Sequence, residues 1–193
     1  MIDVDLNAVA APLKWSEIFK REASTEVELG SGKGRFLLEM AAGQPERNFV
    51  AVERAAKYHK LCCERAARRG LTNVRLIRTT AEDLLFRLLG PACVDAIYVL
   101  FPDPWPKKRH HKRRFFKADT VAAVTRTLAP SGRLLVKTDH EGYAEIIGLM
   151  LEREPGLESC DPCVAFEGLP LTGFEHKYLA QGRDIFSFAA RRI

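Results

Sequence analysis

Residues 26–34 of the 193-residue chain read EVELGSGKG, a short strand-like segment that runs into three glycines at alternate positions. Glycine at Gly30, Gly32 and Gly34 permits a tight turn and lets a ligand approach the backbone, where any side chain would clash. A strand that turns into a helix in this way is typical of the first βα unit of an open parallel sheet. This segment therefore predicts an α/β fold with a ligand at the end of the first strand.

Outward from this turn, β-branched runs alternate with helical patterns along the chain. The sequence predicts strands over 26–29, 48–53, 74–77, 94–100, 133–137, near 163–166, and over 184–190. Helices are expected over 35–42, 55–69, 81–89, 117–128 and 141–153. Such alternation indicates βαβ units, so we expect a Rossmann-like, seven-stranded, mostly parallel sheet with helices on both faces. It would form one domain over residues 21–193, after an N-terminal arm or first helix over 1–20.

Two acidic residues accompany the glycine turn. Glu28 precedes the first glycine by two residues, and Glu53 ends the second predicted strand, 19 residues after Gly34. A pyrophosphate-binding turn would space its glycines G-x-G-x-x-G, whereas here the third glycine comes one residue early. S-adenosylmethionine has no phosphate, and its ammonium and ribose diol suit these acids. We therefore predict that the glycine turn, Glu28 and Glu53 bind that cofactor, with a further contact from Thr80 at the end of the third strand.

The most unusual segment follows the fourth predicted strand and reads FPDPWPKKRHHKRR over residues 101–114. Three prolines in five residues hold Asp103 and Trp105 in a stiff, extended loop. Residues 107–117 carry seven Lys or Arg and no acid, while the whole chain has a net charge of +5, so the remainder carries 5 − 7 = −2. Such a local basic patch at the ligand edge of the sheet predicts phosphate binding.

The same segment resembles the signature of the tRNA (guanine-N7-)-methyltransferase family, which carries the pattern D-P-W-x-K-x-R-H-x-K-R-R. Two later segments are similar to further motifs of that family: KTDHE at 137–141, and LTGFEHK at 171–177 followed by Gly182. The resemblance extends from about residue 27 to residue 193. It implies a class I methyltransferase that uses S-adenosylmethionine to form 7-methylguanosine at position forty-six, in the variable loop of tRNA.

Carried over residue by residue, the resemblance implies roles for three groups of residues. The cofactor site contains the glycine turn with Glu28, Glu53 and Asp103. The side chains that face the substrate are Lys107, Asp139, Thr172, Gly173, Phe174 and Glu175. The RNA contacts are Arg109, His110, His111, Lys112, Arg113 and Arg114. One departure concerns the adenine contact, because many members of the family have Asp or Asn where this chain has Thr80.

The chemistry of guanine N7 is compatible with these residues. N7 has a free lone pair and needs no deprotonation, so no strong general base is required. Methyl transfer moves positive charge onto the purine, and a nearby carboxylate stabilises that charge. Asp103 is therefore the predicted catalytic residue, with Asp139 and Glu175 as alternatives suited to the same role. An acid can also accept hydrogen bonds from guanine N1–H and its amino group, a donor pair that adenine lacks, and Phe174 or Trp105 could stack on the base.

Three other functions fit parts of the sequence. Methyltransferases for DNA amines or protein side chains often carry Asn/Asp-Pro-Pro-aromatic after the fourth strand, but the order DPWP at 103–106, followed by basic residues, favours RNA. A nicotinamide dehydrogenase would need the other glycine spacing. A non-catalytic RNA-binding protein would not need both cofactor acids.

The remaining features indicate a cytoplasmic protein. Residues 1–5 are acidic and form no apolar signal segment, and no apolar run reaches the roughly 18 residues that span a membrane. Cys160 and Cys163 form a C-x-x-C without a second pair, so no metal is predicted. The expected partner is tRNA, with no membrane, and the chain is expected to be a monomer or a homodimer.

Overall fold

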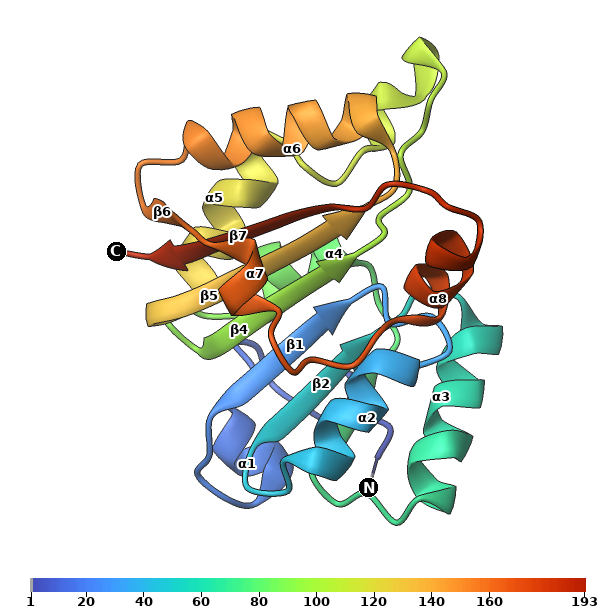
Figure 1. Ribbon diagram of the computed structural model, residues 1–193. Coiled ribbons are helices and arrows are strands. Elements are labelled where there is room, and N and C mark those ends of the chain that lie inside the picture. Colours follow the sequence, from blue (N-terminus) through green and yellow to red (C-terminus); the bar gives the residue numbers. More distant parts are fainter. Residues whose placement is uncertain (1) are drawn as a thin grey trace.

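The computed structural model, which describes residues 2–193, has a seven-stranded sheet at its centre (Figure 1). Met1, the first residue of the predicted arm, lies outside the described residues. The strand order is β3-β2-β1-β4-β5-β7-β6. Their bounds are β1 Thr25–Leu29, β2 Asn48–Val52, β3 Val74–Ile77, β4 Val94–Leu100, β5 Leu128–Thr138, β6 Leu157–Cys160 and β7 Phe186–Arg192. The first five strands pair in parallel and β7 runs antiparallel to β5 and β6, which confirms the predicted mostly parallel sheet.

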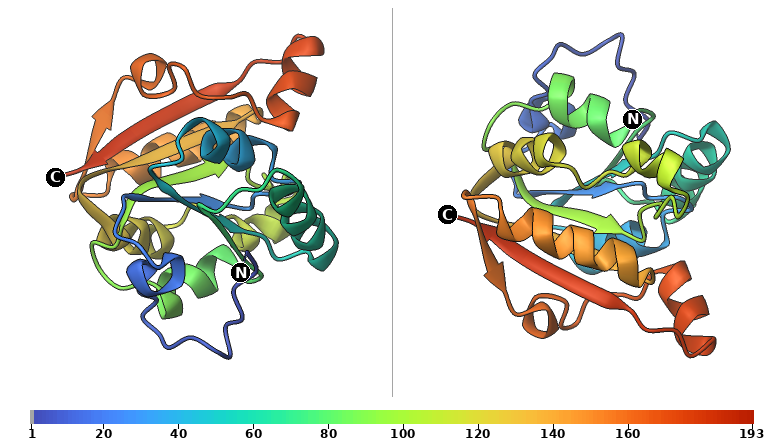
Figure 2. Two further views of the ribbon diagram at one scale, coloured as in Figure 1. Left: turned by 90° about the horizontal axis from the view of Figure 1, so that it is seen from below. Right: turned by 90° about the horizontal axis from the view of Figure 1, so that it is seen from above.

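Helices cover both faces of this sheet, as Figures 1 and 2 show. One face packs against α2 (Arg35–Gly43) and α3 (Ala56–Arg68). The other packs against α5 (Ala118–Thr127), α6 (Glu141–Glu152), and the short α4 (Ala81–Asp83) with the π-helical turn that follows it. Strands β1, β2 and β3 are buried along their whole length, as expected for a parallel sheet covered on both sides. Within residues 2–193, no helix combines the length and apolarity needed to cross a bilayer.

The predicted strand near 163–166 is wrong. The sixth strand lies earlier, at Leu157–Cys160, and the helix α7 (Pro162–Ala165) takes the predicted place. The side chain of Asp161 accepts a hydrogen bond from the backbone N–H of Cys163 at 2.8 Å, and Pro162 occupies the first turn. A capping acid followed by proline starts a helix, and this local signal overrides the strand propensity of Val164 and Phe166 after it. Cys160 and Cys163 are both free thiols.

The N-terminal segment is attached to the domain at two places. Asp3 forms a parallel bridge to Leu76 of β3, with hydrogen bonds on either side of it. Further along, the short helix α1 (Trp15–Phe19) buries Trp15 and Phe19 in the same apolar cluster as the α5 and α6 face.

The strand order places one crevice at the centre of the carboxyl edge. The chain leaves β1 toward β2 and β3 on one side, whereas β4 and β5 lie on the other, so the order reverses between β1 and β4. Ligands of open α/β sheets bind at such a reversal, beyond the carboxyl ends of the strands. Because these five strands are parallel, the segments that follow Leu29, Val52, Leu100 and Thr138 all emerge at this edge.

Candidate active site

The glycine turn after β1 leaves space above its backbone. Gly30, Gly32 and Gly34 all have positive φ angles, of 82°, 53° and 72°. A Cβ atom added at Gly30 or Gly32 would meet no atom within 4 Å, whereas at Gly34 it would lie 2.2 Å from Sγ of Cys62. The first two glycines therefore leave open room for a ligand, and the third permits α2 to pack closely on α3.

Glu53, directly after β2, is held against this turn. One carboxylate oxygen accepts a hydrogen bond from the backbone N–H of Gly32 at 2.9 Å, and the other accepts one from Ala55 at 2.7 Å. A carboxylate has about four lone-pair sites, so about two remain free. The anchored acid is thus oriented at the turn and can still accept hydrogen bonds from a pair of hydroxyl groups, as a ribose presents.

Glu28, near the end of β1, is a buried acid with an unsatisfied oxygen. Only 4% of the residue is exposed, and Oε2 has no hydrogen-bond partner in the structure. Burial raises the pKa of this carboxyl to about 8; the backbone N–H of Leu37 opposes the increase, and the charge of Glu53 adds to it. A buried acid without a full set of partners lowers the stability of the fold. A cationic ligand group would give the free oxygen a partner.

Thr80, at the end of the β3 segment, caps α4. Its hydroxyl oxygen accepts a hydrogen bond from the backbone N–H of Asp83 at 3.0 Å. Asp83 in turn accepts hydrogen bonds from Thr79 and Arg87, so both of its carboxylate oxygens already have partners close by in the sequence. The hydroxyl hydrogen of Thr80 is the group that this residue has left to offer a ligand.

The loop after β4, which carries the exposed Asp103, is fixed by contacts on both sides. Phe101 and Trp105 have φ angles of 57° and 43°, a left-handed conformation that bulky residues keep only when their surroundings impose it. The backbone N–H of Phe101 donates to the carbonyl of Lys137 in β5 at 2.8 Å, and Nε of Arg114 donates to the carbonyl of Pro104 at 2.7 Å. Asp103 lies between these two anchor points.

Arg114, which the resemblance assigns to RNA contact, is buried beneath the loop. Only 5% of the residue is exposed, and its guanidinium lies 4.9 Å from the ring centroid of Tyr143. That cation–π contact and the bond to Pro104 draw the side chain under the loop. Tyr143 also accepts a hydrogen bond from the backbone N–H of Phe116 at 3.2 Å, so Arg114 rests on a rigid base. We infer that Arg114 holds the Asp103 loop in position through its hydrogen bond to Pro104.

The other cations of this segment form an exposed basic strip, defined here as Lys107, Lys108, Arg109, Lys112 and Arg113. Residues Lys108–Arg113 form a 3-10 helix beside the loop. The Trp105 side chain, from the loop, packs against this helix. The Arg113 guanidinium lies 4.9 Å from its ring centroid, and the His110 ring is edge-on at 5.6 Å. Nε2 of His111 is buried without a partner. The helix that carries the basic strip therefore packs on Trp105, two residues after Asp103.

Asp139 and residues 172–175, which the resemblance assigns to the substrate together with Lys107, form a second wall of the site; the Asp103 loop is the first. Thr172 and Glu175 make a reciprocal capping box at the start of α8 (Gly173–Ala180), and both are buried. The ammonium of Lys137, at the end of β5, forms an ion pair with Glu175 and lies 4.3 Å from the Phe166 ring centroid. The Thr172–Glu175 box is thereby attached to the central sheet.

Asp139, the next acid after β5, has a partner of its own: Arg183 donates to its carboxylate at 2.7 Å. The Arg183 side chain is 52% exposed and that of Asp139 17% exposed. Both acids of this second wall are therefore paired with cations of the chain. Neither Lys137 nor Arg183 was predicted as a site residue, although a lysine in an otherwise apolar strand segment (LLVK at 134–137) signals a buried ion pair.

An aromatic cluster connects the Asp103 loop to α8. Phe174, which is 54% exposed, stacks on Tyr178 with ring centroids 5.9 Å apart, and both rings contact Phe101 at 6.1 and 5.5 Å. Phe101 and Tyr178 were not predicted as site residues. The exposed face of Phe174 offers a surface on which a nucleobase can stack.

The known proteins that this chain resembles in sequence are methyltransferases. A family model described as "Putative methyltransferase" matches residues 22–188. The tRNA (guanine-N(7)-)-methyltransferase of Mycobacterium avium is 44% identical over 182 residues, covering 92% of this chain and 70% of the relative. The enzyme of the same name from Chromohalobacter salexigens is 36% identical over 182 residues, covering 91% and 74%.

Solved structures support the fold alone. The 16S rRNA methyltransferase KamB superimposes with a TM-score of 0.63 at 16% identity, covering 92% of each chain. TrmN from Thermus thermophilus gives 0.62 at 18% identity, covering 92% of this chain and 47% of that one. With the family model and these relatives matching most of its length, and with the glycine turn, the DPW loop and the Thr172–Glu175 box at one edge of the sheet, the chain belongs to the tRNA (guanine-N(7)-)-methyltransferase family.

Proposed function

We propose that this protein methylates N7 of guanine in tRNA, at position forty-six of the variable loop, with S-adenosylmethionine as the methyl donor. The observation that carries the proposal is the Asp103 loop, which is fixed beside the β1/β4 crevice and continues into the exposed basic strip. Curated relatives named for this activity support it. The proposed location is the cytoplasm, where its tRNA substrate would be met.

The cofactor is assigned to the glycine turn and its two acids. Gly30 and Gly32 admit it against the backbone, Glu53 accepts from the ribose hydroxyls, and Glu28 pairs with the ammonium group. Thr80 has a hydroxyl hydrogen to donate toward the adenine. When bound, S-adenosylmethionine supplies a methyl group activated by a sulfonium. The unsatisfied oxygen of Glu28 and the open space above the two glycines fit that molecule.

The chain's contribution to the reaction is alignment and charge. Because N7 presents its own lone pair, no residue has to remove a proton before transfer. Asp103 stabilises the positive charge that develops on the purine, and alignment of the reacting atoms supplies much of the acceleration. Asp139 is suited to accept from the guanine N1–H and amino group, because one of its carboxylate oxygens has no hydrogen bond to Arg183, which donates to the other.

The enzymatic assay that tests this function uses the purified chain, methyl-labelled S-adenosylmethionine and unmodified tRNA, followed by nucleoside analysis. We expect labelled 7-methylguanosine as the product, and no label in a transcript whose guanosine at position forty-six is replaced by adenosine. A different labelled nucleoside would contradict the proposed acceptor atom. Label retained in the substituted transcript would contradict the proposed position.

Reversing the charge at two residues of the basic strip should weaken tRNA binding and its dependence on salt. Each phosphate contact contributes about 0.7 to 0.9 to the slope of log K against log salt. In the double variant Arg109→Glu/Lys112→Glu, we expect that slope to become shallower by about 1.5, as measured by fluorescence anisotropy at several salt concentrations.

A matched control carries the same charge change away from the site. Arg68 and Arg69 are exposed at the far end of α3, beyond the opposite edge of the sheet. The double variant Arg68→Glu/Arg69→Glu should keep the wild-type slope. Equal slopes for both double variants would show that the basic strip makes no specific phosphate contacts.

Arg114 should respond differently from its exposed neighbours, because its guanidinium is buried beneath the loop. We expect Arg114→Met to lower kcat at saturating tRNA by about tenfold to a hundredfold, because misplacement of a catalytic group by about 1 Å can cost about a hundredfold. The salt slope of tRNA binding should stay unchanged. Arg114→Lys, which keeps the charge but not the planar contact with Tyr143, should be impaired to a similar degree. A shallower salt slope in Arg114→Met would identify a phosphate contact instead.

A further inference from the structure

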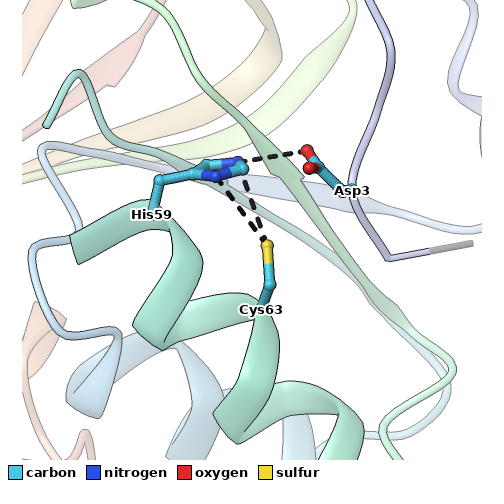
Figure 3. A group of neighbouring side chains, drawn as sticks. All are labelled: Asp3, His59 and Cys63. Carbon is cyan, nitrogen blue, oxygen red and sulfur yellow. Dashed lines mark hydrogen bonds and ion pairs between the residues drawn. The ribbon is translucent and has the colours of Figure 1, made fainter. Parts of the chain in front are cut away.

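Three side chains of metal-binding type converge beside the first turns of α3, outside the proposed methyl-transfer site (Figure 3). His59 and Cys63 are four residues apart and project from the same face of the helix. Asp3 comes from the N-terminal segment that pairs with Leu76 of β3. The three ligand-type atoms lie within 4.8 Å of one another. Two segments distant in sequence thus present an oxygen, a nitrogen and a sulfur to one point.

The distances between these atoms are close to those of a tetrahedral zinc site. With Zn–S of about 2.3 Å and Zn–N or Zn–O of about 2.1 Å, tetrahedral geometry separates S from N by about 3.6 Å and N from O by about 3.4 Å. In the structure, Nε2 of His59 is 3.9 Å from Sγ of Cys63 and 3.2 Å from Oδ1 of Asp3. The S to N separation is thus about 0.3 Å longer than the tetrahedral value, and the N to O separation is about 0.2 Å shorter.

Hydrogen bonding explains the position of Asp3 beside His59, but it does not explain the position of the Cys63 sulfur. His59 and Asp3 make a satisfactory pair at 3.2 Å. The sulfur of Cys63, however, lies 3.9 Å from both ring nitrogens of His59 and is aligned with neither more than the other. A thiol is a weak donor, so this long contact contributes little. A bound cation would give the sulfur a strong interaction.

Space for a further ligand adjoins the cluster. A cavity of about 400 Å³ is lined by Asp3 and His59, and also by Asp5 and Arg78. His59 is buried and therefore fixed in place, whereas Asp3 is exposed toward the cavity side. An ion held by the three side chains would have its fourth position open to water from this cavity.

We propose that Asp3, His59 and Cys63 bind one Zn²⁺ ion. Zinc accepts oxygen, nitrogen and sulfur ligands in one tetrahedral site, whereas magnesium and calcium require oxygen ligands. The ion joins the N-terminal segment to α3, so its expected effect is to stabilise the attachment of that segment.

The test uses the full-length protein without an affinity tag, titrated with Zn²⁺ against a chromogenic chelator and separately with Co²⁺. We expect about one equivalent of each ion to bind, and the Co²⁺ form to show a thiolate-to-metal charge-transfer band. Zn²⁺ should also raise the melting temperature, since a ligand of the folded state stabilises it. Cys63→Ser should abolish the band and weaken zinc binding at least about tenfold.

Two further variants separate ligation from loss of folding. Asp3→Asn changes an exposed side chain and should weaken zinc binding while leaving circular dichroism unchanged. Cys163→Ser removes an exposed thiol outside the cluster and should bind zinc as the wild type does. Failure of the wild type to bind zinc, or retention of the charge-transfer band in Cys63→Ser, would overturn the proposal.

Discussion

Replacing Asp103 with alanine is expected to reduce the rate constant of methyl transfer by about a hundredfold or more, with little change in stability. Removing one group that stabilises transition-state charge costs enzymes about that much. The loop backbone around Asp103 is held by Arg114 and by β5 rather than by the Asp103 side chain, which is exposed. Single-turnover kinetics at saturating cofactor and tRNA measures the effect directly.

Two variants make this result specific. Asp103→Asn retains the shape of the side chain and removes its charge, so it should be impaired nearly as severely as the alanine variant. Glu145→Gln removes a negative charge from an exposed position on α6 and should retain the wild-type rate. A rate close to wild type in either Asp103 variant would eliminate Asp103 as the catalytic residue.

The sequence predicted the elements whose signals are local. The glycine turn at residues 30–34 and the apolar runs of β1 to β4 depend on neighbouring residues, so pattern alone located them. Strand β6 was misplaced because Asp161 and Pro162 begin a helix where Val164 and Phe166 favour a strand. In that case a capping hydrogen bond of a single side chain outweighed intrinsic propensity.

The parts of the site that escaped prediction depend on residues far apart in the chain. Arg114 belongs to a charge run that is typical of a solvated surface, but Tyr143 and the carbonyl of Pro104 bury it. The ion pair of Lys137 with Glu175 joins residues 38 positions apart. The pair of Asp139 with Arg183 spans 44 positions. No local pattern reports such contacts, because only the packing of the complete sheet creates them.

Substitution of Glu28 by glutamine is expected to stabilise the cofactor-free protein, increasingly as pH rises. The folded-state pKa is about 8 and the ordinary value is 4.5, so between these values the unfolded chain loses its proton first. Stability from the protonated carboxyl is fully present below about pH 4.5 and is lost as pH rises through about 8. Urea unfolding at about pH 5 and about pH 8 should show the gain of Glu28→Gln increasing between them.

The same substitution should weaken S-adenosylmethionine binding by about tenfold or more, because a hydrogen-bonded charge partner for the ammonium is lost. Wild-type affinity should increase with pH up to about 8, and calorimetry in buffers of different ionisation heat should detect proton release that Glu28→Gln lacks.

Glu28→Gln is thus expected to raise stability and to lower cofactor affinity. Glu26, two residues earlier in β1, provides the matched control for these opposite effects. It is equally buried, but Arg47 and the Tyr98 hydroxyl both donate to its carboxylate. Glu26→Gln removes a charge that has partners, so it should destabilise the protein and leave cofactor affinity unchanged. If both substitutions instead destabilise the protein, burial of Glu28 is compensated within the fold. The unsatisfied acid would then give no reason to place a cationic group of the cofactor there.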